Sequence, residues 1–128
     1  MRIVRRHPVF SDRRGMITDI LDGPVVDAVT LLTTTAGSIR GNHYHRQTTQ
    51  YSYVVDGRFR LYTQRPGQPR RTRILRKGDL AIIPAGERHA FEALEPSTMI
   101  ACAHGPRAGR GYEQDTVRLR TPLAGGPR

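Results

Sequence analysis

Three histidines and a glutamine are the residues of this chain whose types and spacing could carry chemistry. His43 and His45 are two positions apart, so in an extended strand both imidazoles would point to the same face. Gln50 follows after a short turn, and its amide oxygen can serve as a hard ligand. His89 comes behind a Pro-Ala-Gly turn that could swing it back toward the first pair. Neutral imidazoles bind divalent metals and transfer protons near neutral pH, so the pattern predicts a metal or acid–base site rather than three ordinary polar side chains.

Two glycine-bounded motifs contain these residues. The first has the pattern G…H-x-H…E…G, with Gln50 in place of the glutamate; its matching positions are Gly37, His43, Tyr44, His45 and Gly57. The second has the pattern G…P-x-G…H…N, with Ala93 in place of the asparagine; its matching positions are Gly78, Pro84, Gly86 and His89. In this order the motifs resemble those of the cupin superfamily, RmlC-like proteins included. The resemblance implies an all-β jelly-roll barrel and a divalent metal, such as zinc, iron, nickel or manganese, held by His43, His45, Gln50 and His89.

The glutamine changes the expected charge of the site. A glutamate would add one negative charge, whereas the amide of Gln50 is neutral and leaves a divalent metal with its full charge. We therefore expect such a site to favour an anionic or enolisable ligand, and to lower the pKa of a metal-bound water. The loss of a charged ligand also weakens the hold on the metal, so a metal-free site stays an alternative.

A narrower resemblance surrounds the first motif. The run Arg40-Gly41-Asn42-His43-Tyr44-His45 is similar to that of cupins acting on nucleotide-activated sugars, namely dTDP-4-keto-6-deoxyglucose 3,4-ketoisomerases and the C-terminal domain of capsular polysaccharide reductases. The segments Phe10–Gly15 and Gly111–Asp115 also resemble parts of such proteins. The resemblance implies that His43 and His45 act as acid and base without a metal, that Arg40 assists catalysis by holding the substrate, and that Tyr112 contacts it.

Other assignments stay open for several residues. Arg40 could bind a phosphate in a bidentate manner or be an ordinary surface arginine. Tyr51 and Tyr53 are opposite in parity to Gln50, so they should face away from the site, either packing between two sheets or lying in a dimer interface. His104 could point into the barrel as a second base or simply end the last long strand.

Three functions fit the histidine pattern. The favoured one is an isomerase, epimerase or cyclase that moves a proton on an oxygenated, anionic metabolite such as a nucleotide-activated keto-sugar. The second is a metal-dependent oxygenase, which needs iron with open coordination positions. The third is a barrel that binds a ligand without catalysis.

Short apolar runs separated by glycine and proline predict the elements that position these residues. Runs of this kind are typical of strands joined by turns in a sandwich or barrel. The expected strands are Met16–Leu21, Val25–Thr35, Gly41–His45, Gln50–Val55, Arg58–Thr63, Arg71–Leu75, Leu80–Ile83, His89–Ala93 and Thr98–His104. A length of 128 residues suits one domain, so we expect a barrel over 1–120 and a disordered tail over 121–128.

Composition narrows the class of partner. The net charge of +10 is spread along the chain without a basic block, which makes nucleic acid an unlikely ligand and suits an anionic small molecule. No apolar run is long enough to span a membrane, and Cys102 is the only cysteine, so we expect a cytoplasmic protein. We also expect a homodimer in which Ile3 and Val4 add a strand to the edge of the partner's sheet.

Overall fold

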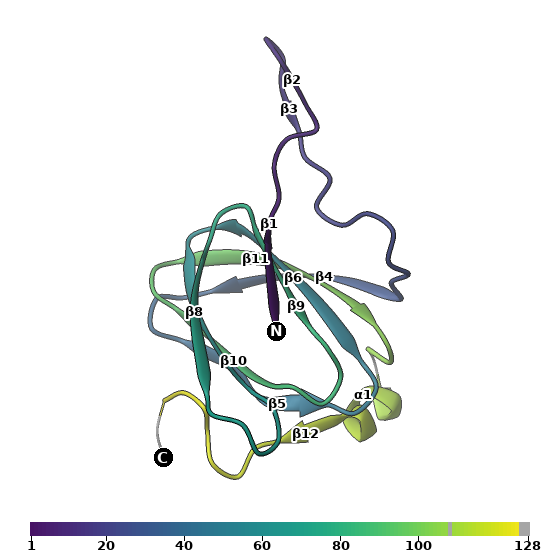
Figure 1. The fold of residues 1–128 in the computed structure, drawn as a ribbon, viewed down its shortest axis with the longest axis vertical. Helices are drawn as coiled ribbons and strands as arrows, with labels where there is room; N and C mark the ends of the chain where they lie inside the picture. Colours follow the sequence, from purple (N-terminus) through teal and green to yellow (C-terminus); the bar gives the residue numbers. More distant parts are fainter. Residues whose placement is uncertain (108, 126–128) are drawn as a thin grey trace.

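The computed structural model of the chain describes residues 1–107 and 109–125 (Figure 1). It contains twelve strands and one short helix. In chain order they are β1 (Arg2–Arg5), β2 (Phe10–Asp12), β3 (Gly15–Ile17), β4 (Ala28–Thr34), β5 (Ile39–His45), β6 (Thr49–Asp56), β7 (Arg58–Gln64), β8 (Arg71–Arg76), β9 (Asp79–Ile83), β10 (Arg88–Ala93), β11 (Ser97–His104), α1 (Gly109–Asp115) and β12 (Thr116–Arg118).

Ten of these strands form two antiparallel sheets that face each other as a barrel. One sheet has the order β1-β9-β6-β11-β4 and the other has the order β12-β5-β10-β7-β8. Between the sheets lies an apolar core that includes the fully buried Phe59, Leu61, Leu75 and Ile83. The predicted all-β jelly-roll barrel is therefore confirmed.

The tight turn between β6 and β7 depends on glycine. Gly57 has a φ of 85°, and a Cβ atom there would lie 2.1 Å from the hydroxyl oxygen of Ser97. Because only glycine combines that backbone conformation with that close approach, the Asp56-Gly57 pair can join two strands of different sheets.

Most expected strands are present, and the differences lie near the ends of the chain. The segment Met16–Leu21 is not one long strand; it supplies only the three residues of β3, which pairs with β2 in a separate hairpin. This hairpin projects from the barrel as an arm, in dark purple at the top of Figure 1. The elements β2, α1 and β12 were not predicted, because each is too short to show a periodic pattern of apolar residues, and Ile3 and Val4 of β1 were expected to form a strand only against a partner.

The segment 121–128 was expected to be a disordered tail, but part of it packs against the barrel. Leu123 and Ala124 are buried and pack against Ala90 of β10, together with Ile39 and Leu119. Residues 126–128 lie outside the described residues. Two adjacent apolar side chains are too weak a signal for a prediction of burial, because the residues that bury them lie far away in the sequence.

The helical content bears on membrane crossing. In the described ranges, 1–107 and 109–125, no helix has the length and apolar character needed to span a membrane.

Candidate active site

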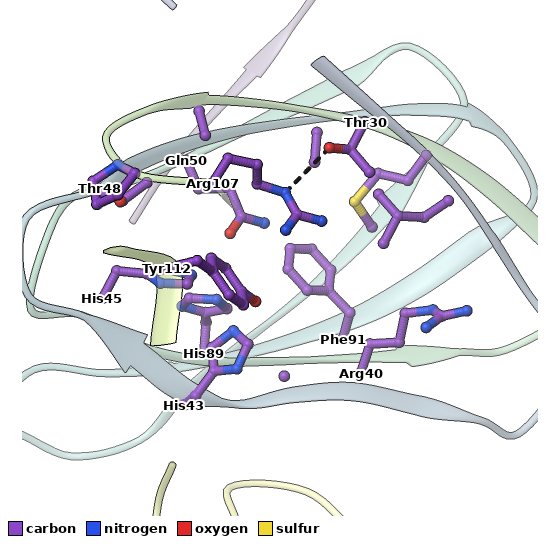
Figure 2. Close-up of a pocket in the computed structure, with 16 residues that line it drawn as sticks. Thr30, Arg40, His43, His45, Thr48, Gln50, His89, Phe91, Arg107 and Tyr112 are labelled. Carbon is purple, nitrogen blue, oxygen red and sulfur yellow. Dashed lines mark hydrogen bonds between the residues drawn. The ribbon is translucent and has the colours of Figure 1, made fainter. Parts of the chain in front are cut away.

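The three histidines meet inside the barrel because β5 and β10 are paired. His43 is the register partner of His89 in this pair, and His45 follows His43 on the same face of β5. The ring centroids are 4.8 Å apart for His43 and His45 and 4.7 Å apart for His43 and His89. Figure 2 shows the three imidazoles grouped at one end of the pocket. The predicted convergence of these side chains is thus present in the structure.

His45 is held by an acidic residue that the histidine pattern did not indicate. Its Nδ1 lies 3.4 Å from a carboxylate oxygen of Asp115 and 3.2 Å from the hydroxyl of Thr116. Asp115 is buried, and its carboxylate also accepts hydrogen bonds from the Gln47 backbone and the Thr48 hydroxyl. A carboxylate fixed in this way favours a proton on Nδ1 and leaves Nε2 of His45 as the free nitrogen for the cavity.

Burial keeps the histidines neutral. It lowers the pKa of His43 to about 3, with further lowering from the neighbouring His89, His45 and Arg118. It also lowers the pKa of His89 to about 4, even though the backbone oxygen of Glu87 opposes the shift. Burial lowers the pKa of His45 as well, but the charge of Asp115 and a hydrogen bond with Gln50 oppose that shift. With a carboxylate that stabilises its protonated form, His45 is the ring best suited to take up and release a proton.

The lowered pKa values predict acid sensitivity of the metal-free protein. Below about pH 6.5 the unfolded chain binds protons at His43 and His89 that the folded chain does not bind, so the free energy of unfolding falls as the pH falls toward about 4. Urea unfolding between these pH values should therefore show a decreasing midpoint. In the variant His89→Gln the urea midpoint should fall less steeply with pH, whatever the stability of the variant at neutral pH. An equally steep fall would contradict a lowered pKa of His89 in the folded protein.

Two arginines make the pocket electropositive. Arg40 lines it from β5, where Nε donates to the Thr34 hydroxyl and Nη2 donates to the Thr33 backbone oxygen. Arg107 lines it from the loop after β11, where Nε donates to the Thr30 hydroxyl. Among the described residues that line the pocket there is no aspartate or glutamate. A pocket with this charge distribution favours an anionic ligand.

Tyr112 of α1 closes one side of the pocket. Its ring lies 6.0 Å from the ring of His45, and the guanidinium carbon of Arg107 lies 4.9 Å from its centre (Figure 2). The remaining wall is largely apolar and includes Leu32, Phe91 and Met99. The site therefore combines polar groups at one end with a surface suited to a ring or methyl group.

Gln50 also lines the pocket, as predicted, from β6 of the opposite sheet. Its amide nitrogen donates to the hydroxyl oxygen of the fully buried Ser52 at 2.8 Å. That bond leaves the amide oxygen for the histidine side of the pocket, where the Gln50 side chain acts to raise the pKa of His45.

The histidine nitrogens form a donor set that fits a divalent metal. One ring nitrogen from each of His43, His45 and His89 lies within 4.8 Å of the others. Within the described part of the chain, His43 Nδ1 and His89 Nε2 are buried and have no hydrogen-bond partner. Unpaired buried nitrogens of neutral imidazoles are the groups that zinc-like ions bind.

Other residues lie where their parity places them. Tyr51 and Tyr53 face outward from β6 and do not pack between the two sheets, since Gln50, Ser52 and Val54 take the inward positions. His104 is exposed and lies 3.1 Å from Asp27. It does not line the pocket, so the possibility of a second base inside the barrel is not realised.

Sequence reasoning missed Asp115 and Arg107 as site residues. Asp115 ends the segment Gly111–Asp115 that resembles sugar-nucleotide enzymes, which was the one available signal. Arg107 is one of many arginines and lies in no motif. Arg107 lines the pocket and Asp115 contacts His45 because the chain after β11 returns to β5, where β12 pairs with it.

Comparison with models of protein families matches the part of the chain that contains the site histidines. A family model described as "Cupin domain" matches residues 30–102. This range runs from within β4 to within β11, and so contains all three histidines of the site. No curated protein sequence matches the chain.

Solved structures share the fold at low sequence identity. A 3,4-ketoisomerase from Helicobacter canadensis is 16% identical, with a TM-score of 0.78 over 91% of this chain and 89% of that one. A dTDP-4-dehydrorhamnose 3,5-epimerase from Sulfolobus tokodaii is 21% identical, with a TM-score of 0.73 over 89% of this chain and 73% of that one. The 3,4-ketoisomerase QdtA from Thermoanaerobacterium thermosaccharolyticum, solved in complex with TDP, is 15% identical, with a TM-score of 0.77 over 93% and 88%. At these identities the likeness establishes a common fold.

Proposed function

The chain belongs to the cupin family, and from that premise we propose that it is an isomerase that transfers a proton beside the ketone of a nucleotide-activated keto-sugar. The observation that carries the proposal is the contact between His45 and the buried Asp115, because it provides an oriented base inside a pocket that favours anions. Several structures with this fold are ketoisomerases and epimerases, one of them in complex with TDP-4-keto-6-deoxyglucose, and this supports the same substrate class.

The proposed reaction moves one proton between two carbons and one proton between two oxygens, with no change in redox state overall. Nε2 of His45 removes the proton from the carbon next to the ketone, and the electron pair moves to the carbonyl oxygen to form an enediolate. The proton then returns to the former ketone carbon. The neutral ring of His43 carries the hydroxyl proton from one sugar oxygen to the other, which completes the exchange of ketone and alcohol.

The arginines would bind the anionic part of the substrate. Arg40 and Arg107 can each donate to phosphate oxygens with the N–H groups that Thr33, Thr34 and Thr30 do not use. Tyr112, beside His45, would cover the sugar or the nucleotide base. This placement puts charge at the pocket opening and the reacting carbon at the histidines.

A direct assay tests the proposed reaction. The protein is incubated in deuterium oxide with TDP-4-keto-6-deoxyglucose, and the sugar signals are followed by NMR. We expect a new keto-sugar isomer, with the hydrogen at the reacting carbons exchanged or transferred. Unchanged sugar signals at stoichiometric enzyme, for this substrate and for other TDP- or UDP-linked keto-sugars, would contradict the function.

The donor set supports a second candidate, a metal-dependent cupin enzyme. We propose that His43, His45, His89 and Gln50 would hold a divalent ion if one binds, because two of these rings have buried unpaired nitrogens. The metal would supply Lewis-acid stabilisation of an enolate or activation of water. Elemental analysis of protein purified without added metal discriminates the alternatives: iron would favour an oxygenase, and a metal-free active protein would favour bare acid–base chemistry.

We further propose that the protein forms a homodimer. Ile3 and Val4 pair with β9 of their own chain, and β1 is the edge strand of its sheet, so its other side could still pair with a partner's sheet. The exposed apolar groups lie elsewhere. Val29 and Leu31 of the edge strand β4 are 67% and 68% exposed on the outward face, and the arm carries the exposed Phe10, Met16 and Ile17. A second copy of the chain could cover both surfaces at once.

Light scattering at micromolar concentration should give the mass of a dimer. The double variant Val29→Ser/Leu31→Ser should shift it toward a monomer, because these outward side chains contribute nothing to the core of a single chain. A monomer mass for the unmodified protein would contradict the dimer.

We also propose that the protein is located in the cytoplasm, which fits an enzyme of nucleotide-sugar metabolism.

A further inference from the structure

An irregularity in β5 places two site residues on the same face. Arg40 and His43 both line the pocket, yet they are three positions apart and a regular strand would send them to opposite faces. The register between β10 and β5 shifts here: His89 pairs with His43, but Ala90 pairs with Gly41. Asn42 is therefore the extra residue of a β-bulge, and the bulge reverses the parity of the strand.

The backbone at the bulge adopts a conformation that few residues accept. Asn42 has a φ of 57°, and within the described ranges it is the only residue other than glycine with a positive φ. Asparagine tolerates this left-handed region better than most residues. The preceding Gly41 has a φ of 100°, and a Cβ atom there would lie 2.9 Å from the backbone oxygen of His89.

The side chain of Asn42 is hydrogen-bonded to the backbone of the segment around Leu123. Its Oδ1 accepts hydrogen bonds from the backbone nitrogens of Leu123 at 2.9 Å and Ala124 at 3.2 Å. Its Nδ2 donates to the backbone oxygen of Ala124 at 3.2 Å. Leu123 and Ala124 are themselves buried, and Arg70 donates to the backbone oxygen of Leu123 at 2.6 Å. The amide of Asn42 thus joins the bulge to an anchored segment.

We propose that Asn42 is a positioning residue: its three bonds to Leu123 and Ala124 hold the bulge, so that Arg40 and His43 face the pocket together. The segment around Leu123 is then part of the scaffold of the site. Loss of the bonds lets the bulge relax toward regular pairing, which turns the ring of His43 away from His45 and His89. The inference rests on the proposed function only in taking these residues as the site.

Two substitutions separate the hydrogen bonds from the backbone conformation. Asn42→Gly accepts a positive φ even more readily but loses all three bonds. Asn42→Asp keeps the acceptor for Leu123 and Ala124 and loses one bond. Arg70→Ala is the matched control, because it removes a bond to the same segment without touching the bulge. The readout is the NMR signals of the imidazole C–H groups of the three site histidines at one fixed pH, together with the thermal midpoint.

In Asn42→Gly we expect the imidazole signal of His43 to shift by more than its line width or to broaden by exchange. In Asn42→Asp we expect this signal to lie close to its position in the unmodified protein. Arg70→Ala should lower the thermal midpoint and leave the His43 signal in place. A His43 signal in Asn42→Gly that matches the unmodified protein would overturn the proposal, since the backbone conformation alone would then suffice. An equal shift in Arg70→Ala would also overturn the proposal, because the shift would then reflect a general loss of order in the segment around Leu123.

If Asn42→Gly does not fold, Leu123→Gly carries the test. It leaves Asn42 intact and removes the buried side chain that anchors its partner segment. A His43 signal that shifts more in Leu123→Gly than in Arg70→Ala supports the proposal, and a signal that is unchanged or shifts no more than in Arg70→Ala overturns it. None of these measurements uses a substrate. Failure of the keto-sugar assay would therefore leave the role of Asn42 standing, and failure here would leave the proposed reaction standing.

Discussion

The variant His45→Gln should lose nearly all isomerase activity, with kcat lower by about 10²- to 10⁴-fold, the usual contribution of a positioned general base. Glutamine has a similar reach but cannot accept a proton, and Asp115 would still hold the loop and helix through Gln47 and Thr48. KM should change much less than kcat, because the proposed anion contacts lie at Arg40 and Arg107. Steady-state kinetics on a keto-sugar substrate provide the measurement.

The chain offers a matched control for this variant. His104 also has a carboxylate beside it, from Asp27 at 3.1 Å, but the pair is exposed and outside the pocket. His104→Gln should therefore keep nearly the full kcat. If His45→Gln retained more than about a tenth of the activity, a different residue would have to be the base, since a general base is worth more than that. His43 would be the next residue to replace.

The variant Gln50→Glu should bind a divalent metal more tightly and catalyse more slowly. The pocket can accept the change because the two side chains are nearly isosteric, and the hydroxyl of Ser52 can donate to a carboxylate instead of accepting from the amide. A negative charge beside a divalent cation should raise affinity by about tenfold or more. The same charge repels the enediolate and the anionic substrate, and it raises the pKa of nearby imidazoles, so less His45 is in the basic form.

Metal content and turnover of Gln50→Glu need to be measured on the same preparation. More metal with lower turnover agrees with the account given above. More metal with equal or higher turnover would mean that Gln50 is a neutral replacement of the glutamate. If neither protein binds metal, the histidines act as acid and base alone, and the metal-dependent alternative is removed.

The site histidines could be found from the sequence because their signal is local. His43 and His45 share a face by the two-residue repeat of a strand, and the motif around Pro84 and Gly86 indicates a turn that returns His89 to them. The barrel could be predicted for a similar reason: strands and turns leave short patterns of apolar residues, glycine and proline that do not depend on distant contacts.

Sequence parity alone would have misplaced Arg40 relative to His43. Both were proposed as site residues from a resemblance, and alternation in a regular strand sets them on opposite faces. The bulge at Asn42 resolves the conflict. It lies where β10 pairs with β5 on one side and β12 pairs with it on the other, and the segment near Leu123 bonds the side chain of Asn42. None of these contacts leaves a pattern within β5 itself.

The sequence by itself determined the strand-rich barrel, the three histidines with Gln50, and the excess of positive charge, because each of these is a property of composition or short-range spacing. Only the tertiary structure decided which histidine is paired with a carboxylate, which of the many arginines line the pocket, and that Leu123 supports the site. Three of these contacts join residues roughly 70 to 80 positions apart: His45 with Asp115, Thr30 with Arg107 and Asn42 with Leu123. Side-chain periodicity reports the neighbours of a residue within its own strand or helix, so contacts of that range cannot appear in it.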